Sequence, residues 1–198
     1  MLSSLKKPVL LSIILLSILI LPGCLTAPPE NKVNICKIFK QYPKWYWAAS
    51  ESRSRWKVPI NVMMAVMHQE SRFTADAKPP RTKLLWVIPW TRPSSAYGYT
   101  QALDDTWDGY KKSTGNSGAD RDNFKDAIDF VGWYINNANR KAGIDKRNAY
   151  ALYLAYHEGI GGYQRGTYRK KRWLMQVARK VDRRAASYRQ QLARCERS

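Results

Sequence analysis

Apolar residues recur at helical spacing along most of this chain, and the clearest case is a segment that begins at Pro59 and ends at Phe73. Proline suits the first turn of a helix, and the apolar positions that follow it repeat with a helical period. We therefore predict an interior helix here. Its apolar positions are Ile60, Val62, Met63, Met64, Val66 and Met67.

Other segments predict further helices with defined ends. Asparagine or aspartate precedes several of them as an N-cap, and a glycine follows two of them as a stop, at Gly115 and Gly143. No stretch shows convincing period-two alternation with hairpin turns. The fold class is therefore mainly α, a single domain with at most a small irregular β part. The further helices are expected over about 44–57, 104–114, 123–142, 148–158 and 172–194.

The first residues have the pattern of an export signal. Lys6 and Lys7 precede an apolar run over residues 9–21, which is shorter than the ~20 residues that a membrane span needs. Such a run matches the core of a signal peptide. Residues 1–23 are therefore expected to be a signal peptide.

The end of this leader, Leu21-Pro22-Gly23-Cys24, resembles a bacterial lipobox, in which processing leaves the cysteine as the lipid-bearing first residue. Acyl chains contribute ~0.8 kcal/mol per buried CH2, so several of them on Cys24 would hold the protein at a membrane. The next residue is Leu25 rather than the aspartate that retains many lipoproteins in the inner membrane. The expected location is therefore the bacterial cell envelope, and if the host has two membranes, the analogy with such lipoproteins favours the periplasmic face of the outer one.

The segment after the lipobox is expected to connect the lipid to the domain. Residues 24–35 form the lipidated N-terminus and tether in this interpretation, and the prolines and polar residues of 26–33 predict disorder there. The folded domain then spans residues 36–198.

Charge limits the partners that the domain can have. Its formal net charge of +19 calls for an anionic partner or surface. Because the chain is predicted to be exported, wall polymer and lipid headgroups are the candidates, and no nucleic-acid partner is expected. A basic surface that serves solubility alone is the alternative.

Two further cysteines follow Cys24, at Cys36 and Cys195. In an oxidising compartment such a pair would join the two ends of the domain, closing a loop worth up to ~5 kcal/mol in the chain-entropy model. The chain has no CxxC and two histidines, which leaves no ligand cluster with zinc spacing. We expect a Cys36–Cys195 disulfide, no metal site and no cofactor.

Glu70 is the candidate catalytic residue, because it is the acid in the last turn of the predicted interior helix. Burial and the negative end of the helix dipole both disfavour its ionised form, so its pKa should be raised. A carboxylic acid that stays protonated near neutral pH is suited to general acid catalysis. The alternative is a solvated glutamate at a helix end.

Three motifs together resemble the soluble-lytic-transglycosylase (SLT) domain family, over most of the chain after about residue 45. Glu70-Ser71-Arg72-Phe73 is similar to its Glu-Ser-x-Phe motif, and Gly98-Tyr99-Thr100-Gln101 to its Gly-x-x-Gln segment. Ala155-Tyr156-His157-Glu158-Gly159 resembles its Ala-Tyr-Asn-x-Gly segment, with His157 in place of the asparagine. Each motif is weak alone, and the three in family order are specific.

The resemblance implies a lysozyme-like fold and a monomeric enzyme that acts on peptidoglycan glycan strands. Glu70 would protonate the β-1,4 bond between N-acetylmuramic acid and N-acetylglucosamine, then take a proton from the sugar's C6 hydroxyl to leave a 1,6-anhydro end. The resemblance also assigns substrate-binding roles to Ser71, Gly98, Gln101, Tyr156 and His157. Glycine permits close backbone approach to a ligand, and glutamine offers a donor and an acceptor to a sugar acetamide.

Other interpretations stay open. Gln101 could be a surface residue after an ordinary turn, and Tyr156 a buried structural tyrosine. Glu158 adds a second carboxylate, which could activate water and make the protein a hydrolase like goose-type lysozymes. A lipoprotein that binds peptidoglycan without cleaving it is the alternative from a different class.

The gap between the glutamate motif and the glutamine motif is longer than is usual in the family, by roughly a dozen residues. The extra segment is residues 78–93. We predict a loop or short hairpin beside the active site, in which Trp86 or Trp90 stacks on sugar faces or touches lipid. A flap that covers exposed core is the alternative.

Overall fold

The computed structural model describes residues 26–79, 83–84, 88–89 and 94–196. The predicted signal peptide (1–23) and Cys24 lie outside these residues. Within the described ranges, no helix combines the length and apolar character that crossing a membrane requires.

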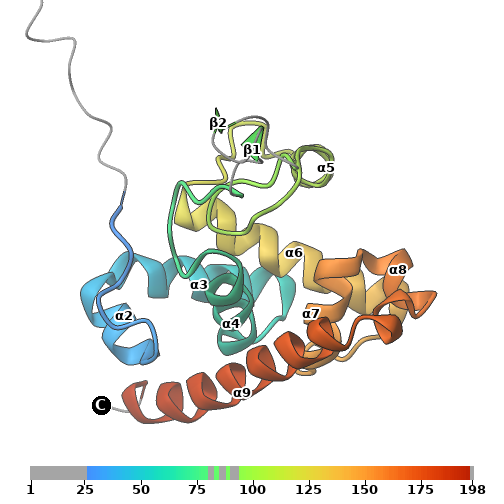
Figure 1. Cartoon of the computed structure of the whole chain (residues 1–198). Helices are drawn as coiled ribbons and strands as arrows, with labels where there is room; N and C mark the ends of the chain where they lie inside the picture. Colours follow the sequence, from blue (N-terminus) through green and yellow to red (C-terminus); the bar gives the residue numbers. More distant parts are fainter. Residues whose placement is uncertain (1–25, 80–82, 85–87, 90–93, 197–198) are drawn as a thin grey trace, which may run out of the picture.

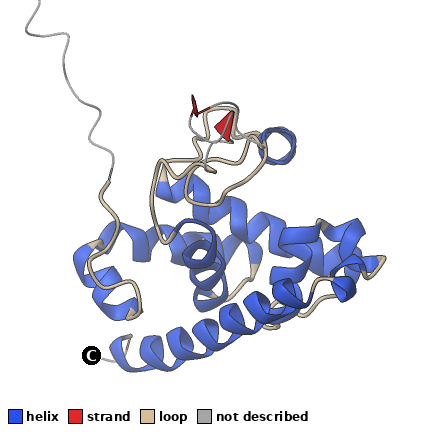
Figure 2. Ribbon diagram, viewed as in Figure 1, coloured by secondary structure: helices blue, strands red, loops and turns tan. Residues whose placement is uncertain are grey.

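The described chain is mainly helical, with one short hairpin, which confirms the predicted fold class (Figures 1 and 2). Helices begin and end close to the residues that the capping pattern indicated, including the left-handed stops at Gly115 and Gly143. The elements are α2 (Ile35–Gln41), α3 (Pro43–Trp56), α4 (Ile60–Ser71), β1 (Lys83–Leu84), β2 (Ile88–Pro89), α5 (Asp104–Thr114), α6 (Phe124–Ala142), α7 (Ala149–Glu158), α8 (Ile160–Gln164), the 3-10 helix η1 (Thr167–Lys170) and α9 (Arg172–Cys195).

Helix α4 is the interior helix that the apolar pattern predicted. It packs against α3, α6, α7 and α9, and Met63, Met64 and Met67 are fully buried. Each of these side chains contributes about 1.5–3 kcal/mol by leaving water. The helix ends where Arg72 enters the left-handed region, with φ 52°. The buried surroundings of α4 therefore extend to its last turn, which carries Glu70.

Helix α9 runs along one side of the molecule and packs against α4 and α7 (Figure 1). Its inner face is apolar and its outer face is basic, as the sequence pattern predicted. At its C-terminal end Cys195 forms a disulfide with Cys36 of α2, with 6.1 Å between their Cα atoms, so the predicted pairing is confirmed. The buried residues of α9 are Leu174, Ala178, Val181, Ala185, Tyr188 and Leu192.

The predicted disorder of residues 26–33 is wrong for the greater part of this segment. Pro29 is buried, and the Tyr42 hydroxyl donates to the Ala27 carbonyl oxygen over 2.7 Å. The Tyr188 hydroxyl donates likewise to the Lys32 carbonyl oxygen. The two tyrosines satisfy backbone carbonyls that a free tether would leave to water, so the segment is packed along α2 and α9 and core packing begins before residue 36.

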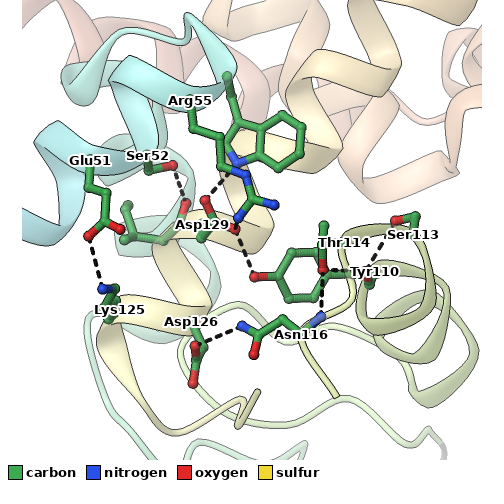
Figure 3. A network of polar contacts seen from close by, with 12 residues as sticks. Glu51, Ser52, Arg55, Tyr110, Ser113, Thr114, Asn116, Lys125, Asp126 and Asp129 are labelled. Atoms are coloured by element: carbon green, nitrogen blue, oxygen red, sulfur yellow. Dashed lines mark hydrogen bonds and ion pairs between the residues drawn. The ribbon is translucent and has the colours of Figure 1, made fainter. Parts of the chain in front are cut away.

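One carboxylate joins three helices at the end of the molecule that carries α5. Asp129 of α6 accepts hydrogen bonds from Arg55 (3.1 Å) and Trp56 (2.7 Å) of α3 and from the Tyr110 hydroxyl of α5 (2.8 Å). Figure 3 shows this network around Asp129. Because hydrogen bonds to a charged acceptor are the strong ones, Asp129 fixes α5 against the α3–α6 pair.

The extra segment at 78–93 contains a hairpin, as predicted. β1 and β2 pair antiparallel, with Lys83 opposite Pro89 and Leu84 opposite Ile88, and the hairpin projects from the helical body (Figure 2). Trp86 and Trp90 lie outside the described residues, so their contact with sugar or lipid stays a prediction.

Candidate active site

Three residues that are far apart in the sequence, Glu70, Gln101 and Tyr156, line one cavity of about 390 Å³. Its walls come from the last turn of α4, the turn before α5, and helices α5, α6 and α7. The lining thus combines an acid with apolar side chains and with other polar side chains. The lining residues are Glu70, Gln101, Ala102, Leu103, Thr106, Phe130, Tyr134, Tyr156, His157, Glu158 and Gly159.

The Glu70 carboxyl has the protonation behaviour of a general acid. Its side chain is only partly exposed, and removal from water raises its pKa from 4.5 to about 7. A hydrogen bond from the Tyr153 hydroxyl stabilises the carboxylate and limits that rise. Glu70 is therefore protonated in a large fraction of molecules at neutral pH, and either of its two forms is accessible.

Two tyrosines of α7 lie one helical turn apart beside Glu70. The Tyr156 hydroxyl donates to the Thr100 carbonyl oxygen over 2.8 Å. Burial, reinforced by the nearby Glu70 charge, raises the pKa of both Tyr153 and Tyr156 well above 10. Both phenols therefore stay neutral and act as hydrogen-bond donors.

Gln101 is held in a fixed orientation. Its φ of 51° lies in the left-handed region, which costs a non-glycine residue roughly 1–3 kcal/mol. Its Nε2 donates to the carbonyl oxygens of Ala77 (2.9 Å) and Gly98 (3.0 Å). Two carbonyl acceptors identify the atom facing them as nitrogen, so the amide oxygen is the group left for a ligand. The predicted donor-and-acceptor pair is thus reduced to an acceptor.

Gly98 and Ser71, both predicted to bind substrate, do not line the cavity. Gly98 is buried at φ 77°, and a Cβ on it would lie 2.2 Å from the Arg121 carbonyl oxygen. The close approach that requires glycine is therefore to the chain's own backbone and not to a ligand. Ser71 is buried, and its hydroxyl faces the Met67 carbonyl oxygen at 3.5 Å. Both residues are neighbours in sequence of lining residues, Gln101 and Glu70, but neither reaches the cavity surface.

The third motif places a histidine and a glutamate at the cavity edge. His157 is exposed, and its Nδ1 lies 3.0 Å from the Glu158 carboxylate. Glu158 also accepts hydrogen bonds from Lys171 (2.7 Å) and from the Thr167 hydroxyl. The Lys171 and Thr167 hydrogen bonds lower the pKa of Glu158 to about 2, so it is ionised and weakly basic.

Larger hollows exist elsewhere on the surface without comparable chemistry. One of about 830 Å³ is lined in part by Arg53, Lys57 and Lys146. Burial lowers the pKa of Lys146, but its ammonium already donates to the Trp56 carbonyl and the Asn136 amide oxygen, both at 2.7 Å. Lys146 therefore caps the end of α3. Among the described residues, no group of three or more His, Cys, Asp or Glu is arranged to hold a metal ion.

Sequence reasoning missed Tyr153, which contacts the candidate acid. The signal was its position three residues before Tyr156, because residues three apart on a helix share a face. Tyr134 was missed too. It lines the cavity from α6, and its hydroxyl donates to the Ala155 carbonyl oxygen over 2.9 Å.

The family comparison covers the whole of this structure's helical body. The model of the transglycosylase SLT domain matches residues 12–195. A comparison with curated proteins gives no match. The family match spans nearly the entire chain and includes all three motifs that build the cavity, so the chain belongs to the transglycosylase SLT domain family.

Proposed function

We propose that this protein is a peptidoglycan lytic transglycosylase, which cleaves the bond between N-acetylmuramic acid and N-acetylglucosamine without water. Membership of the SLT family supports peptidoglycan as its substrate. The observation that carries the proposal is Glu70, a carboxylic acid with a pKa of about 7 in a cavity lined by hydrogen-bonding groups.

In the first step, Glu70 donates its proton to the glycosidic oxygen as the bond from that oxygen to C1 breaks. Positive charge develops at C1, and the substrate's own acetamide stabilises it. The Gln101 amide oxygen is available to accept a hydrogen bond from a sugar N–H or hydroxyl. The neutral Tyr153 phenol donates to the carboxylate that forms on Glu70.

In the second step, the Glu70 carboxylate accepts the proton of the C6 hydroxyl while that oxygen bonds to C1. The ring closes as a 1,6-anhydro sugar and Glu70 is protonated again, so no water is consumed. A single group can serve both steps because its pKa lies near the working pH.

The state of Glu158 favours this reaction over hydrolysis. A hydrolase of this bond uses a second carboxylate to activate water or to attack C1. Glu158 is the second carboxylate that lines the cavity, and Lys171, Thr167 and His157 all contact it. A group with a pKa of about 2 is a poor base at neutral pH.

We also propose a cellular location for the protein. The export signal and the lipobox support a lipid on Cys24 and a periplasmic location at the outer membrane. The chain would work there as a monomer on glycan strands within reach of its anchor.

Digestion of purified peptidoglycan, followed by mass spectrometry of the released fragments, tests this function. We expect 1,6-anhydro ends from the parent protein and none from Glu70→Gln, while Glu51→Gln, a change at an exposed surface carboxylate, keeps full activity. Hydrolysed ends would replace the proposal by a lysozyme-like activity. Intact glycan bound by the parent protein would replace it by a binding function.

A further inference from the structure

A second hollow, of about 500 Å³, lies between α4 and α9 and has a basic lining. Arg72 follows the end of α4, and Lys180, Arg183 and Arg184 lie on α9. We call these four residues the cationic groove. The three cations on α9 share one face of that helix with Ser187, because positions 180, 183, 184 and 187 are three or four residues apart.

The cationic groove has no internal counter-charge. No acidic residue lines the hollow, and none of its four cations forms an ion pair within the described part of the chain. The acid nearest to them along α9, Asp182, does not line the hollow. Like charges held together without a counter-ion are destabilising, so the arrangement favours an anion from outside.

His68 also lines the groove, and its pKa is affected by the same positive charges. Its imidazole is largely buried and packs edge-on against Phe73. Burial, with the charges of Arg184, Arg72 and Lys32, lowers its pKa from 6.5 to about 4. The imidazole is therefore neutral and does not add to the positive charge of the groove.

One cation of the groove, Arg184, is held by packing against a buried aromatic side chain. Arg184 is half-buried, with its guanidinium 5.7 Å from the centre of the Tyr188 ring. Tyr188 is itself buried and hydrogen-bonded to the Lys32 carbonyl. The backbone of Arg72 is fixed by the left-handed turn that ends α4, and its side chain is exposed beside the groove. The packed guanidinium group of Arg184 is therefore oriented, and guanidinium groups match the planar oxygen pairs of phosphate and carboxylate.

The groove is separate from the catalytic cavity. His68 and Glu70 are two residues apart on α4, which is about 200° around a helix with 3.6 residues per turn. The cavity and the groove accordingly share no lining residue. An anion in the groove would leave the cavity open to a glycan strand.

We infer that the cationic groove is a binding site for a phosphate group, and that this site lies on the side of α4 away from the catalytic cavity. Four cations exceed what one carboxylate needs, whereas a phosphate brings up to two negative charges and at least two acceptor oxygens. The source of the phosphate is a lipid headgroup or a soluble phosphate.

The pKa of His68, followed by NMR of its ring protons, tests the site and distinguishes the two sources. The chain has two histidines, so a His157→Gln variant assigns the signals. The protein is first measured in phosphate-free buffer, and then either inorganic phosphate is added, with chloride at equal ionic strength as the control, or nanodiscs of phosphatidylglycerol are added. Occupancy by a phosphate should raise the His68 pKa by about one unit, because it offsets the nearby cations.

A rise with inorganic phosphate supports a soluble ligand, and a rise with phosphatidylglycerol alone supports a lipid headgroup. Arg184→Gln should remove either response, whereas Lys141→Gln, which removes an exposed charge outside the groove, should keep it. A His68 pKa that stays at its starting value in both arms, or one that responds equally to chloride, overturns the site. Glycan cleavage is not part of this readout, so the outcome is independent of the proposed activity.

Discussion

The Tyr153 hydroxyl interacts with the Glu70 carboxyl, where α7 lies beside the last turn of α4, and this interaction lowers the pKa of Glu70. Two effects oppose each other at this contact. Burial raises the pKa of Glu70, the phenol lowers it, and the result is a pKa of about 7. The acidity of the candidate catalytic residue thus depends on a side chain from a distant part of the sequence.

Tyr153→Phe should therefore raise the pKa of Glu70 above 7. Cleavage begins with protonated Glu70, so the alkaline limb of the pH–rate profile should move to higher pH, by about one unit for a lost hydrogen bond to a charged group. Release of soluble fragments from peptidoglycan at a series of pH values measures it.

Tyr156→Phe is the matched control for that change, because the Tyr156 hydroxyl donates to the Thr100 carbonyl and not to Glu70. Its alkaline limb should move less than that of Tyr153→Phe. Equal limbs in the parent and in Tyr153→Phe would contradict the role assigned to this contact.

The raised pKa of Glu70 also predicts how stability depends on pH. The folded protein binds the Glu70 proton up to about pH 7, whereas the unfolded chain releases it near 4.5. Between these values the folded state holds more protons, so the contribution of Glu70 to stability is complete below pH 4.5 and is lost as the pH rises to 7. Full burial would make this about 3 kcal/mol, and partial exposure of the side chain reduces it.

Glu70→Gln isolates that contribution, because the amide resembles the protonated acid and does not titrate. Chemical denaturation should give equal free energies of unfolding for the parent and the variant at pH 4.5. At pH 8 the variant should be more stable by about 1–3 kcal/mol. A difference that is the same at both pH values would show that the pKa of Glu70 is not raised by folding.

Asp129 supplies a prediction about the scaffold. Asp129→Ala removes the acceptor of hydrogen bonds from Arg55, Trp56 and Tyr110 and leaves the Tyr110 hydroxyl without it. We expect the free energy of unfolding to fall by about 2–4 kcal/mol. Glu51→Gln, at the exposed pair with Lys125, should change it by less than about 1 kcal/mol. Urea denaturation of the two variants checks this, and equal losses would contradict the proposed role of Asp129.

The sequence predicted α3, α4, α5, α6, α7 and α9 because their signals are local, whereas the short elements α2, α8 and η1 were not predicted. The period of the methionines in α4, the caps before α6 and α7, and the glycines after α5 and α6 each act within a few residues. The disulfide followed from compartment and cysteine number. The packed course of residues 26–33 could not be predicted this way, because it depends on hydroxyl groups of Tyr42 and Tyr188 that reach the segment only in the folded protein.

The motifs predicted which residues form the candidate site, but not the packing contacts of each one. Motifs identified Glu70, Gln101, Tyr156 and His157 as residues that should meet, and the structure brings them to one cavity. Motifs did not reveal that Gly98 packs on the Arg121 backbone, because the sequence shows that a glycine is present but not which neighbouring group requires it.

Glu158 gives the sharpest distinction between the two reactions. It is ionised and bonded to Lys171, Thr167 and His157, so a transglycosylase should not need it as a base. Glu158→Gln should keep 1,6-anhydro ends as the main product.

The same variant should lose about 1 kcal/mol of stability at neutral pH, because the Lys171 ammonium is left without its carboxylate and is itself partly exposed. The pKa of Glu158 is depressed to about 2, so its contribution is present above pH 4.5 and is lost as the pH falls toward 2. The stability difference between parent and variant should therefore shrink as the pH falls toward 2. Mass spectrometry of the products and denaturation at pH 7 and pH 2.5 measure the two effects separately. If the parent instead produced hydrolysed ends and Glu158→Gln abolished them, Glu158 would be the base of a hydrolase, and its ion pair with Lys171 would have to open during the reaction.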